Sequence, residues 1–432
     1  MGLRHSRRSS KLALVLAGGG LTGAVYEIGA LRAIDDLLVD RTVNDFDIYV
    51  GTSAGAIVAS FLANGLTADE MYQVIDGTHP TIRPIAREHI FDLNQGEFIR
   101  RMASIPRRLA LAWYTYFRYL SEVTLLDILW SLSDALPSGL YDGMALERYM
   151  RSVLTMPGRT NCFNDTEKPL YVIATDLNTG ERAVFGGHRC DEVPISLAVA
   201  ASSAVPMLYK PVCIRDHEYI DGGMRGTASI DLAIEQGATL VVCVNPLVPY
   251  SSSEDSEAAR TERLSARGVP AIASQVTRIT SHAGLSYQIK QLRRQHPEVD
   301  IILIEPQPTD RRMFYGNIMH YQARLEVARH GFESVTLDLA EDYPSYKETL
   351  ARHGVPITRR LVIEELAEIH NSGSDPLVIR RVLEARTHPC ARHRRNSPFC
   401  QLQQTLAQLD LELDAVEDGL IGRAPSFGTL VS

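Results

Sequence analysis

The chain alternates short apolar runs with segments in which apolar residues recur every three or four positions. The first pattern is typical of buried strands and the second of amphipathic helices. Residues 24–38 have helical spacing, and a second helix is expected over 56–65, ending at Gly65. Apolar runs that predict buried strands lie at 11–17, 47–51, 169–177, 239–246 and 300–306. Strands alternating with helices in this way predict an α/β fold with a mainly parallel central sheet.

Two regions interrupt this regular order. Residues 78–160 contain the aromatic-rich stretch "RLALAWYTYFRYLSEVTLLDILWSL" and are expected to form a helical, cap-like insertion. The polar stretch at 250–268 is expected to be a mobile loop. We expect a basic, disordered leader at 1–11, a catalytic domain at 12–246 with the insertion inside it, a continuation of the α/β core at 247–355, and a helical C-terminal extension with a flexible tail at 356–432.

Composition narrows the classes of protein that fit this organisation. The 432 residues are 45% hydrophobic and carry a formal net charge of −8, which argues against nucleic acid as a general partner. Six scattered cysteines form no metal or disulfide framework, although Cys390 and Cys400 could pair in an oxidising compartment. The apolar run after the basic leader is too short for a signal peptide, and no other run is long enough to cross a membrane. We therefore expect a cytoplasmic protein.

The stretch "DIYVGTSAGAIVASF" contains a G-x-S-x-G motif between a predicted strand and a predicted helix. In that context the serine, Ser53, sits on a sharp, strained turn that exposes its hydroxyl at the carboxyl edge of the sheet. A serine nucleophile needs a base. Asp221 ends another predicted strand just before two glycines, in "EYIDGG", and can also be an ordinary Asp-Gly turn. His217 is the histidine that could replace it, whereas His282 and His320 lie in helix-like segments.

The stretch "LALVLAGGGLTG" after the first strand has two interpretations. Its glycines fit the dinucleotide fingerprint, for which Asp40 or Asp45 would be the ribose-binding acid. The same turn could instead direct main-chain N–H groups at the oxyanion of an ester under attack.

The ordered set "GGGLTG", "GTSAG" and "DGG" resembles the patatin-like phospholipase family, and so do "ATDLNTGERAVF" and "SLAVAASSAVPMLYKPV". The resemblance covers roughly residues 12–246 and implies a three-layer α/β/α fold with a catalytic Ser–Asp dyad. By this resemblance Ser53 is the nucleophile, Asp221 is the general base, and the turn Gly18, Gly19 and Gly20 forms the oxyanion hole. The neighbouring motif residues are expected to support these turns: Gly23, Gly51, Ala54, Gly55, Gly222 and Gly223.

The resemblance implies a lipid acyl hydrolase that acts on phospholipids, lysophospholipids or other glycerolipids through an acyl-Ser53 intermediate. It implies no cofactor, no metal, and a lipid substrate at a membrane or micelle surface. There are two alternatives. The protein could be an acyltransferase that passes the acyl group to an alcohol with the same dyad, or a weakly active lipid-binding scaffold. One departure is Thr22, which stands where the family usually has Arg or Lys. The aromatic stretch around Trp113 could lie at a membrane surface or be buried as a cap over the core.

Overall fold

The computed structural model describes residues 10–118, 136–187, 192–251, 264–309, 313, 321–373 and 375–384. Its centre is an eight-stranded sheet with the strand order β10-β9-β1-β2-β4-β8-β7, in which β5 also pairs with β4. The strands are β1 (Leu12–Leu16), β2 (Ile48–Thr52), β4 (Leu170–Asp176), β5 (Arg182–Phe185), β7 (Val212–Ile214), β8 (His217–Asp221), β9 (Leu240–Val244) and β10 (Asp300–Ile304). A separate parallel pair joins β3 (Gly139–Tyr141) to β6 (Met207–Tyr209).

The five strands from β10 to β4 are parallel to their neighbours, and the pairs β4–β5, β4–β8 and β7–β8 are antiparallel. The predicted α/β class with a mainly parallel sheet is therefore confirmed. Each of the five predicted strands is present, within two residues of its expected ends.

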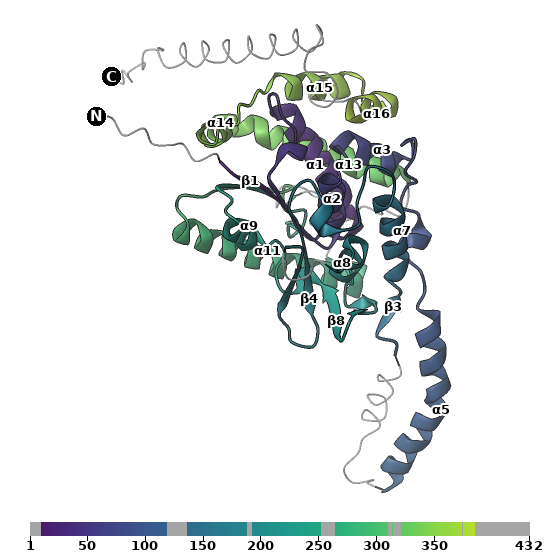
Figure 1. Ribbon diagram of the computed structural model, residues 1–432. Coiled ribbons are helices and arrows are strands. Elements are labelled where there is room, and N and C mark those ends of the chain that lie inside the picture. The colour runs from purple at the N-terminus through teal and green to yellow at the C-terminus, as the bar shows by residue number, and fades with distance from the viewer. Residues whose placement is uncertain are drawn as a thin grey trace, which may run out of the picture.

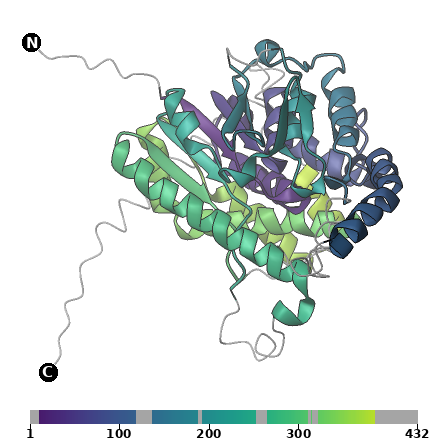
Figure 2. The same ribbon diagram turned by 90° about the horizontal axis from the view of Figure 1, so that it is seen from below.

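Helices cover both faces of the sheet (Figures 1 and 2). Leu12, Leu14 and Leu16 of β1 belong to the cluster formed with the helices of one face, whereas Ala13 and Val15 pack with those of the other. The first face carries α1 (Gly20–Leu37), α2 (Ala54–Ala63), α3 (Ala68–Asp76), α7 (Met144–Leu154), α8 (Ile195–Ser202) and α13 (Tyr321–Glu341). The second face carries α9 (Ile230–Glu235) and α11 (Val269–Gln295).

The described part of the 78–160 insertion contains α4 (Arg87–Ile90), α5 (Gln95–Arg118), β3 and α7. Figure 1 shows α5 leaving the body beside β3 and projecting away from it. The aromatic side chains from Trp113 to Tyr119, and the chain from 119 to 135, lie outside the described residues. Within the described ranges, no helix is both long and apolar enough to cross a lipid bilayer.

The C-terminal region continues from the core through α14 (Tyr343–Arg352), α15 (Arg360–Asn371) and α16 (Pro376–Glu384). Arg32 of α1 is fully buried beneath these helices and is paired with Asp36 of its own helix. It also donates to Glu365 of α15 at 3.3 Å and to the carbonyl of Val382 in α16 at 3.1 Å. The extension is therefore attached to the helix that begins at the glycine turn. Cys390 and Cys400, with the rest of the predicted tail, lie outside the described residues.

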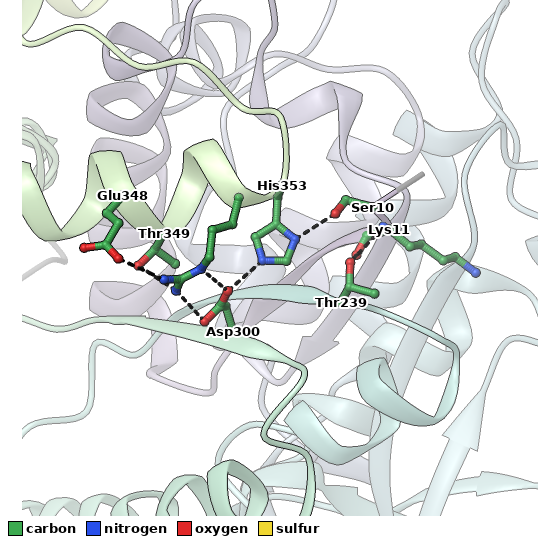
Figure 3. A network of polar contacts seen from close by, with 8 residues as sticks. Ser10, Lys11, Thr239, Asp300, Glu348, Thr349 and His353 are labelled. Atoms are coloured by element: carbon green, nitrogen blue, oxygen red, sulfur yellow. Dashed lines mark hydrogen bonds and ion pairs between the residues drawn. The ribbon is translucent and has the colours of Figure 1, made fainter. Parts of the chain in front are cut away.

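A polar network joins α14 to the amino ends of the strands (Figure 3). His353 lies 2.8 Å from both the Ser10 hydroxyl and the Asp300 carboxylate, and Asp300 also accepts a hydrogen bond from Arg352 at 2.8 Å. The hydrogen-bonded series Ser10, His353 and Asp300 contains the same residue types as a catalytic triad. It lies, however, at the amino edge of the parallel strands, whereas ligands of open α/β sheets bind at the carboxyl edge. Arg352 and His353 hold the pKa of the Asp300 carboxylate below its usual value. Because the network lies at the amino edge, we interpret it as structural.

Candidate active site

Ser53 lies in a sharp turn between β2 and α2. Its φ and ψ angles are 53° and −120°, an unusual backbone conformation for a residue with a side chain. The turn is tight because a Cβ atom on Gly55 would lie 2.4 Å from the carbonyl oxygen of Leu16, and one on Gly51 would lie 2.5 Å from the Cα of Ala56. Ala54 is buried and is the first residue of α2. The sequence prediction of a strained strand-to-helix turn at Ser53 agrees with this geometry.

Ser53 and Asp221 are in contact although they are far apart in the sequence. The Ser53 hydroxyl donates a hydrogen bond of 2.5 Å to Oδ2 of Asp221, and the two residues are only 5% and 4% exposed. The other carboxylate oxygen, Oδ1, accepts the N–H of Gly223 at 2.7 Å. Burial raises the pKa of Asp221 to about 6, although the hydrogen bonds from Ser53 and Gly223 act in the opposite direction.

Main-chain contacts hold Asp221 at the end of β8. Its N–H donates to the carbonyl of Ala204 at 2.9 Å, and its own carbonyl accepts the Thr175 hydroxyl at 3.1 Å. Gly222 follows against β4, where a Cβ would lie 2.2 Å from the carbonyl oxygen of Ile173. A side chain at Gly222 would therefore push the aspartate away from Ser53.

The glycine turn after β1 lies beside the serine, since a Cβ built on Gly18 would be 3.3 Å from the Cβ of Ser53. Of the three glycines expected to offer N–H groups to an oxyanion, one already has an acceptor within the fold, namely Gly18. Its N–H already donates to the carbonyl of Thr227 at 3.1 Å. Among the residues that the structure describes, the N–H groups of Gly19 and Gly20 meet no acceptor. These two N–H groups are therefore the ones that the turn leaves available to a ligand.

Gly23 completes the turn by donating its N–H to the carbonyl of Gly19 at 3.0 Å, which is the first hydrogen bond of α1. Pro246, just after β9, packs closely on both glycines: a Cβ on Gly19 would lie 2.4 Å, and one on Gly23 2.9 Å, from its Cγ. Thr22 is the third residue of α1 and is half-buried.

Ser202 is a site residue that the sequence did not single out. It is fully buried at the end of α8, where its hydroxyl accepts the N–H of Ser53 at 2.7 Å and donates to the carbonyl of Ile173 at 2.5 Å. The next residue, Ser203, donates its hydroxyl to the carbonyl of Ser53 at 3.4 Å. In the sequence, the stretch "AASSAVP" contributed only to the resemblance to the family. No general spacing rule identifies a serine whose side chain supports the main chain of another residue.

The candidate histidines lie elsewhere. His217 begins β8 and contacts Asp176 at 2.7 Å, whereas the hydroxyl of Ser53 is bonded to Asp221. His282 is on α11, 3.3 Å from Glu305, and His320 lies outside the described residues. The Ser53 hydroxyl is therefore hydrogen-bonded to a carboxylate and not to an imidazole.

Comparison with known proteins identifies the family. The family model "Patatin-like phospholipase" matches residues 14–234, which include Ser53 and Asp221. The chain is 28% identical over 221 residues to the uncharacterized protein YqhO of Bacillus subtilis, with 49% of this chain and 62% of YqhO covered.

Two further relatives have names that refer to lipid hydrolysis. A probable lipid hydrolase, 463L, of Invertebrate iridescent virus 6 is 21% identical, with 51% of this chain and 63% of the viral protein covered. A cGAMP-activated phospholipase of Pseudomonas aeruginosa is 25% identical, with 50% of this chain and 53% of that protein covered. The chain thus spans less than two thirds of the length of these relatives. On the extent of the family match, the chain belongs to the patatin-like phospholipase family.

Proposed function

We propose that this protein is a serine acyl hydrolase that cleaves the carboxylic ester of a lipid. The observation that carries the proposal is the buried 2.5 Å contact between the Ser53 hydroxyl and the Asp221 carboxylate, beside a turn with two unused N–H groups. A nucleophile, a base and a place for the oxyanion are the three parts that acyl transfer requires.

The proposed reaction assigns one step to each of these groups. Asp221 accepts the Ser53 proton while Oγ attacks the ester carbonyl, and the negative charge that forms on the carbonyl oxygen is stabilised by the N–H groups of Gly19 and Gly20. The C–O bond to the alcohol then breaks, and Asp221 returns the proton to the leaving alkoxide. A water molecule attacks the acyl-Ser53 ester with Asp221 again as base, which releases the fatty acid and restores the serine. A carboxylate is a weak base toward an alcohol, and the burial that raises the pKa of Asp221 makes it a better one.

The substrate class that fits best is a phospholipid, lysophospholipid or other glycerolipid. The family and the names of the relatives support a lipid. Thr22 offers no cation to an anionic head group, so we expect the glycine turn to recognise the ester and not a phosphate. Cys162, Cys213 and Cys243 are free thiols, which suits the reducing conditions of the cytoplasm.

The proposal is tested by measuring hydrolysis of a short-chain p-nitrophenyl ester by the wild type, Ser53→Ala and Asp221→Asn, with circular dichroism as the control for folding. We expect turnover by the wild type and background rates for both variants. A fluorophosphonate probe should label the wild type and leave Ser53→Ala unlabelled. Full activity of Asp221→Asn would refute the dyad and direct attention to the histidines. Absence of turnover and labelling in the folded wild type would favour the scaffold alternative.

A further inference from the structure

A series of exposed apolar side chains begins next to the dyad. The loop that contacts Ser53 and Asp221 through Ser203 and Ala204 continues into β6, where Met207 is 84% exposed and has a φ of 66°. A methionine held in a strained conformation with most of its surface in water contributes little to the core. An exposed apolar residue indicates a contact surface when it belongs to a larger apolar patch.

Hydrogen bonds connect β6 to the projecting helix α5. β6 pairs with β3, in the register Gly139 with Met207. The N–H of Asn94, which immediately precedes α5, donates to the carbonyl of Leu140 at 3.0 Å. The side chain of Glu97, in the first turn of α5, accepts a hydrogen bond from the Ser138 hydroxyl at 2.8 Å. The active-site loop, β6, β3 and α5 therefore form one connected structure.

This structure exposes large apolar side chains along its length. We define the docking face by the exposed side chains Leu93, Phe98, Ile99, Met102, Leu140 and Met207. Leu177 directly follows β4, and Met224 lies in the turn after Asp221. Both are also about half exposed. The docking face thus extends from the carboxyl edge of the sheet to the outer helix.

The charge of α5 differs in sign from that of the whole protein. Five arginines and one acidic residue, Glu97, lie between Gln95 and Arg118, although the whole chain has a net charge of −8. Arg100 and Arg107 are exposed on the same helix, but at roughly 100° per residue they lie on the other side of it from Phe98 and Met102. A helix with apolar side chains and an excess of arginine is suited to the boundary between acyl chains and anionic head groups.

We propose that the docking face binds an anionic lipid bilayer and thereby brings the entrance of the active site onto the membrane surface. Ser53 is almost completely buried, and an ester held in a bilayer can reach it only if the surrounding surface meets the lipid. The proposal rests on the proposed function for its purpose, but the binding itself requires no catalysis. It can therefore be tested in a protein that does not hydrolyse its substrate.

The test measures co-sedimentation of the full-length Ser53→Ala protein with vesicles of phosphatidylcholine alone or mixed with phosphatidylglycerol. We expect binding to the mixed vesicles that weakens as salt is added. Adding Phe98→Glu and Met102→Glu should reduce partitioning at least ten-fold. Replacing Arg100 and Arg107 by Gln should reduce it on the mixed vesicles alone, and by less than about five-fold for each arginine, because both lie on the side of α5 away from Phe98 and Met102.

A matched control is available on the other side of the sheet. Val276 and Ile279 of α11 are 52% and 49% exposed, the same as Phe98 and Met102 respectively. Val276→Glu with Ile279→Glu should leave vesicle binding unchanged. Equal losses from the two pairs, or failure of the parent protein to bind either kind of vesicle, would overturn the proposal. So would a shift in the sedimentation coefficient of the free protein caused by the Phe98 and Met102 changes, since a second copy would then cover the face.

The same variants separate this proposal from the proposed function. With Ser53 intact, the Phe98 and Met102 variant should hydrolyse the water-soluble ester at the wild-type rate and lose activity only on vesicles. Loss of both activities would contradict a role limited to docking. Vesicle binding by a protein that is inactive on every ester would support the docking face and refute the hydrolase.

Discussion

Replacing Ser202 by alanine tests whether a buried hydroxyl holds the nucleophile in its reactive conformation. In the native structure this hydroxyl joins the N–H of Ser53 to the carbonyl of Ile173, with contacts of 2.7 and 2.5 Å. Ser202→Ala removes both contacts at a fully buried position. Two main-chain groups therefore become buried without a partner.

The magnitude follows from these two groups. An unsatisfied buried donor or acceptor costs about 1–3 kcal/mol, so for the two groups together we expect a loss of about 2–6 kcal/mol in the free energy of unfolding. The conformation of Ser53, with its positive φ, itself costs roughly 1–3 kcal/mol and is stabilised by the same hydrogen bond. If that contribution is lost from the transition state, kcat falls about 10- to 100-fold, since each 1.4 kcal/mol changes a rate ten-fold. The KM for a soluble ester should change little.

The assay compares kcat, KM and the rate of fluorophosphonate labelling with the urea midpoint of the same protein. Ser60→Ala is the matched control, because Ser60 is equally buried on α2 but donates only to the carbonyl of Ala56, one turn earlier in the same helix. It should be near wild type in activity and lose under about 1 kcal/mol of stability. A Ser202→Ala protein that is destabilised as expected but retains the wild-type kcat would refute a positioning role for the hydroxyl.

Three other predictions concern the base, the glycine turn and the C-terminal extension. Because Asp221 must be ionised to accept a proton and burial raises its pKa to about 6, kcat/KM for a soluble ester should rise as the pH increases and reach half its plateau near pH 6; a midpoint near 4 would mean a hydrated carboxylate. Gly19→Ala should lower kcat by about 10²–10³-fold, because its Cβ would clash with Pro246 and displace the Gly19 N–H; thermal unfolding of the same protein measures how much of the loss is due to destabilisation, and wild-type turnover would exclude Gly19 as an oxyanion donor. Arg32→Met should cost about 3–5 kcal/mol in urea unfolding by leaving the buried Asp36 and its neighbour Glu365 without their cation, and Glu365→Gln in the same chain should restore part of this loss if the pairing is correct.

Much of the candidate active site at the carboxyl edge of the sheet could be predicted from the sequence, because each motif depends on local geometry. The apolar runs predict the parallel strands, and G-x-S-x-G between a strand and a helix predicts the strained turn at Ser53. Asp221 was predicted from its position before two glycines, together with the family resemblance. These positions are specified within a few residues of the motif, so one sequence is enough to identify them.

The rest of the site depends on contacts between distant segments, which no local pattern records. Gly18 looks identical to Gly19 in the sequence, yet only Gly18 donates its N–H to Thr227, more than two hundred residues away. In the sequence Ser202 resembles many serines near the end of a helix. Its role becomes visible only in the fold, where it lies between β4 and the Ser53 turn. The exposed apolar residues of the docking face are equally ordinary when each is considered alone.

The carboxylate base and the exposed apolar surface have a common physical requirement. Asp221 accepts a proton well only when it is poorly hydrated, and in the protein alone this condition is met by burying it beside Ser53. A substrate entrance large enough for a lipid would admit water to the same carboxylate. If the apolar docking face meets a bilayer, acyl chains and not water cover the entrance while the ester enters. Asp221 can then stay poorly hydrated during the reaction. On this argument the Ser–Asp dyad and the docking face, which includes Met207, depend on each other. We therefore expect the highest activity when the docking face is in contact with lipid.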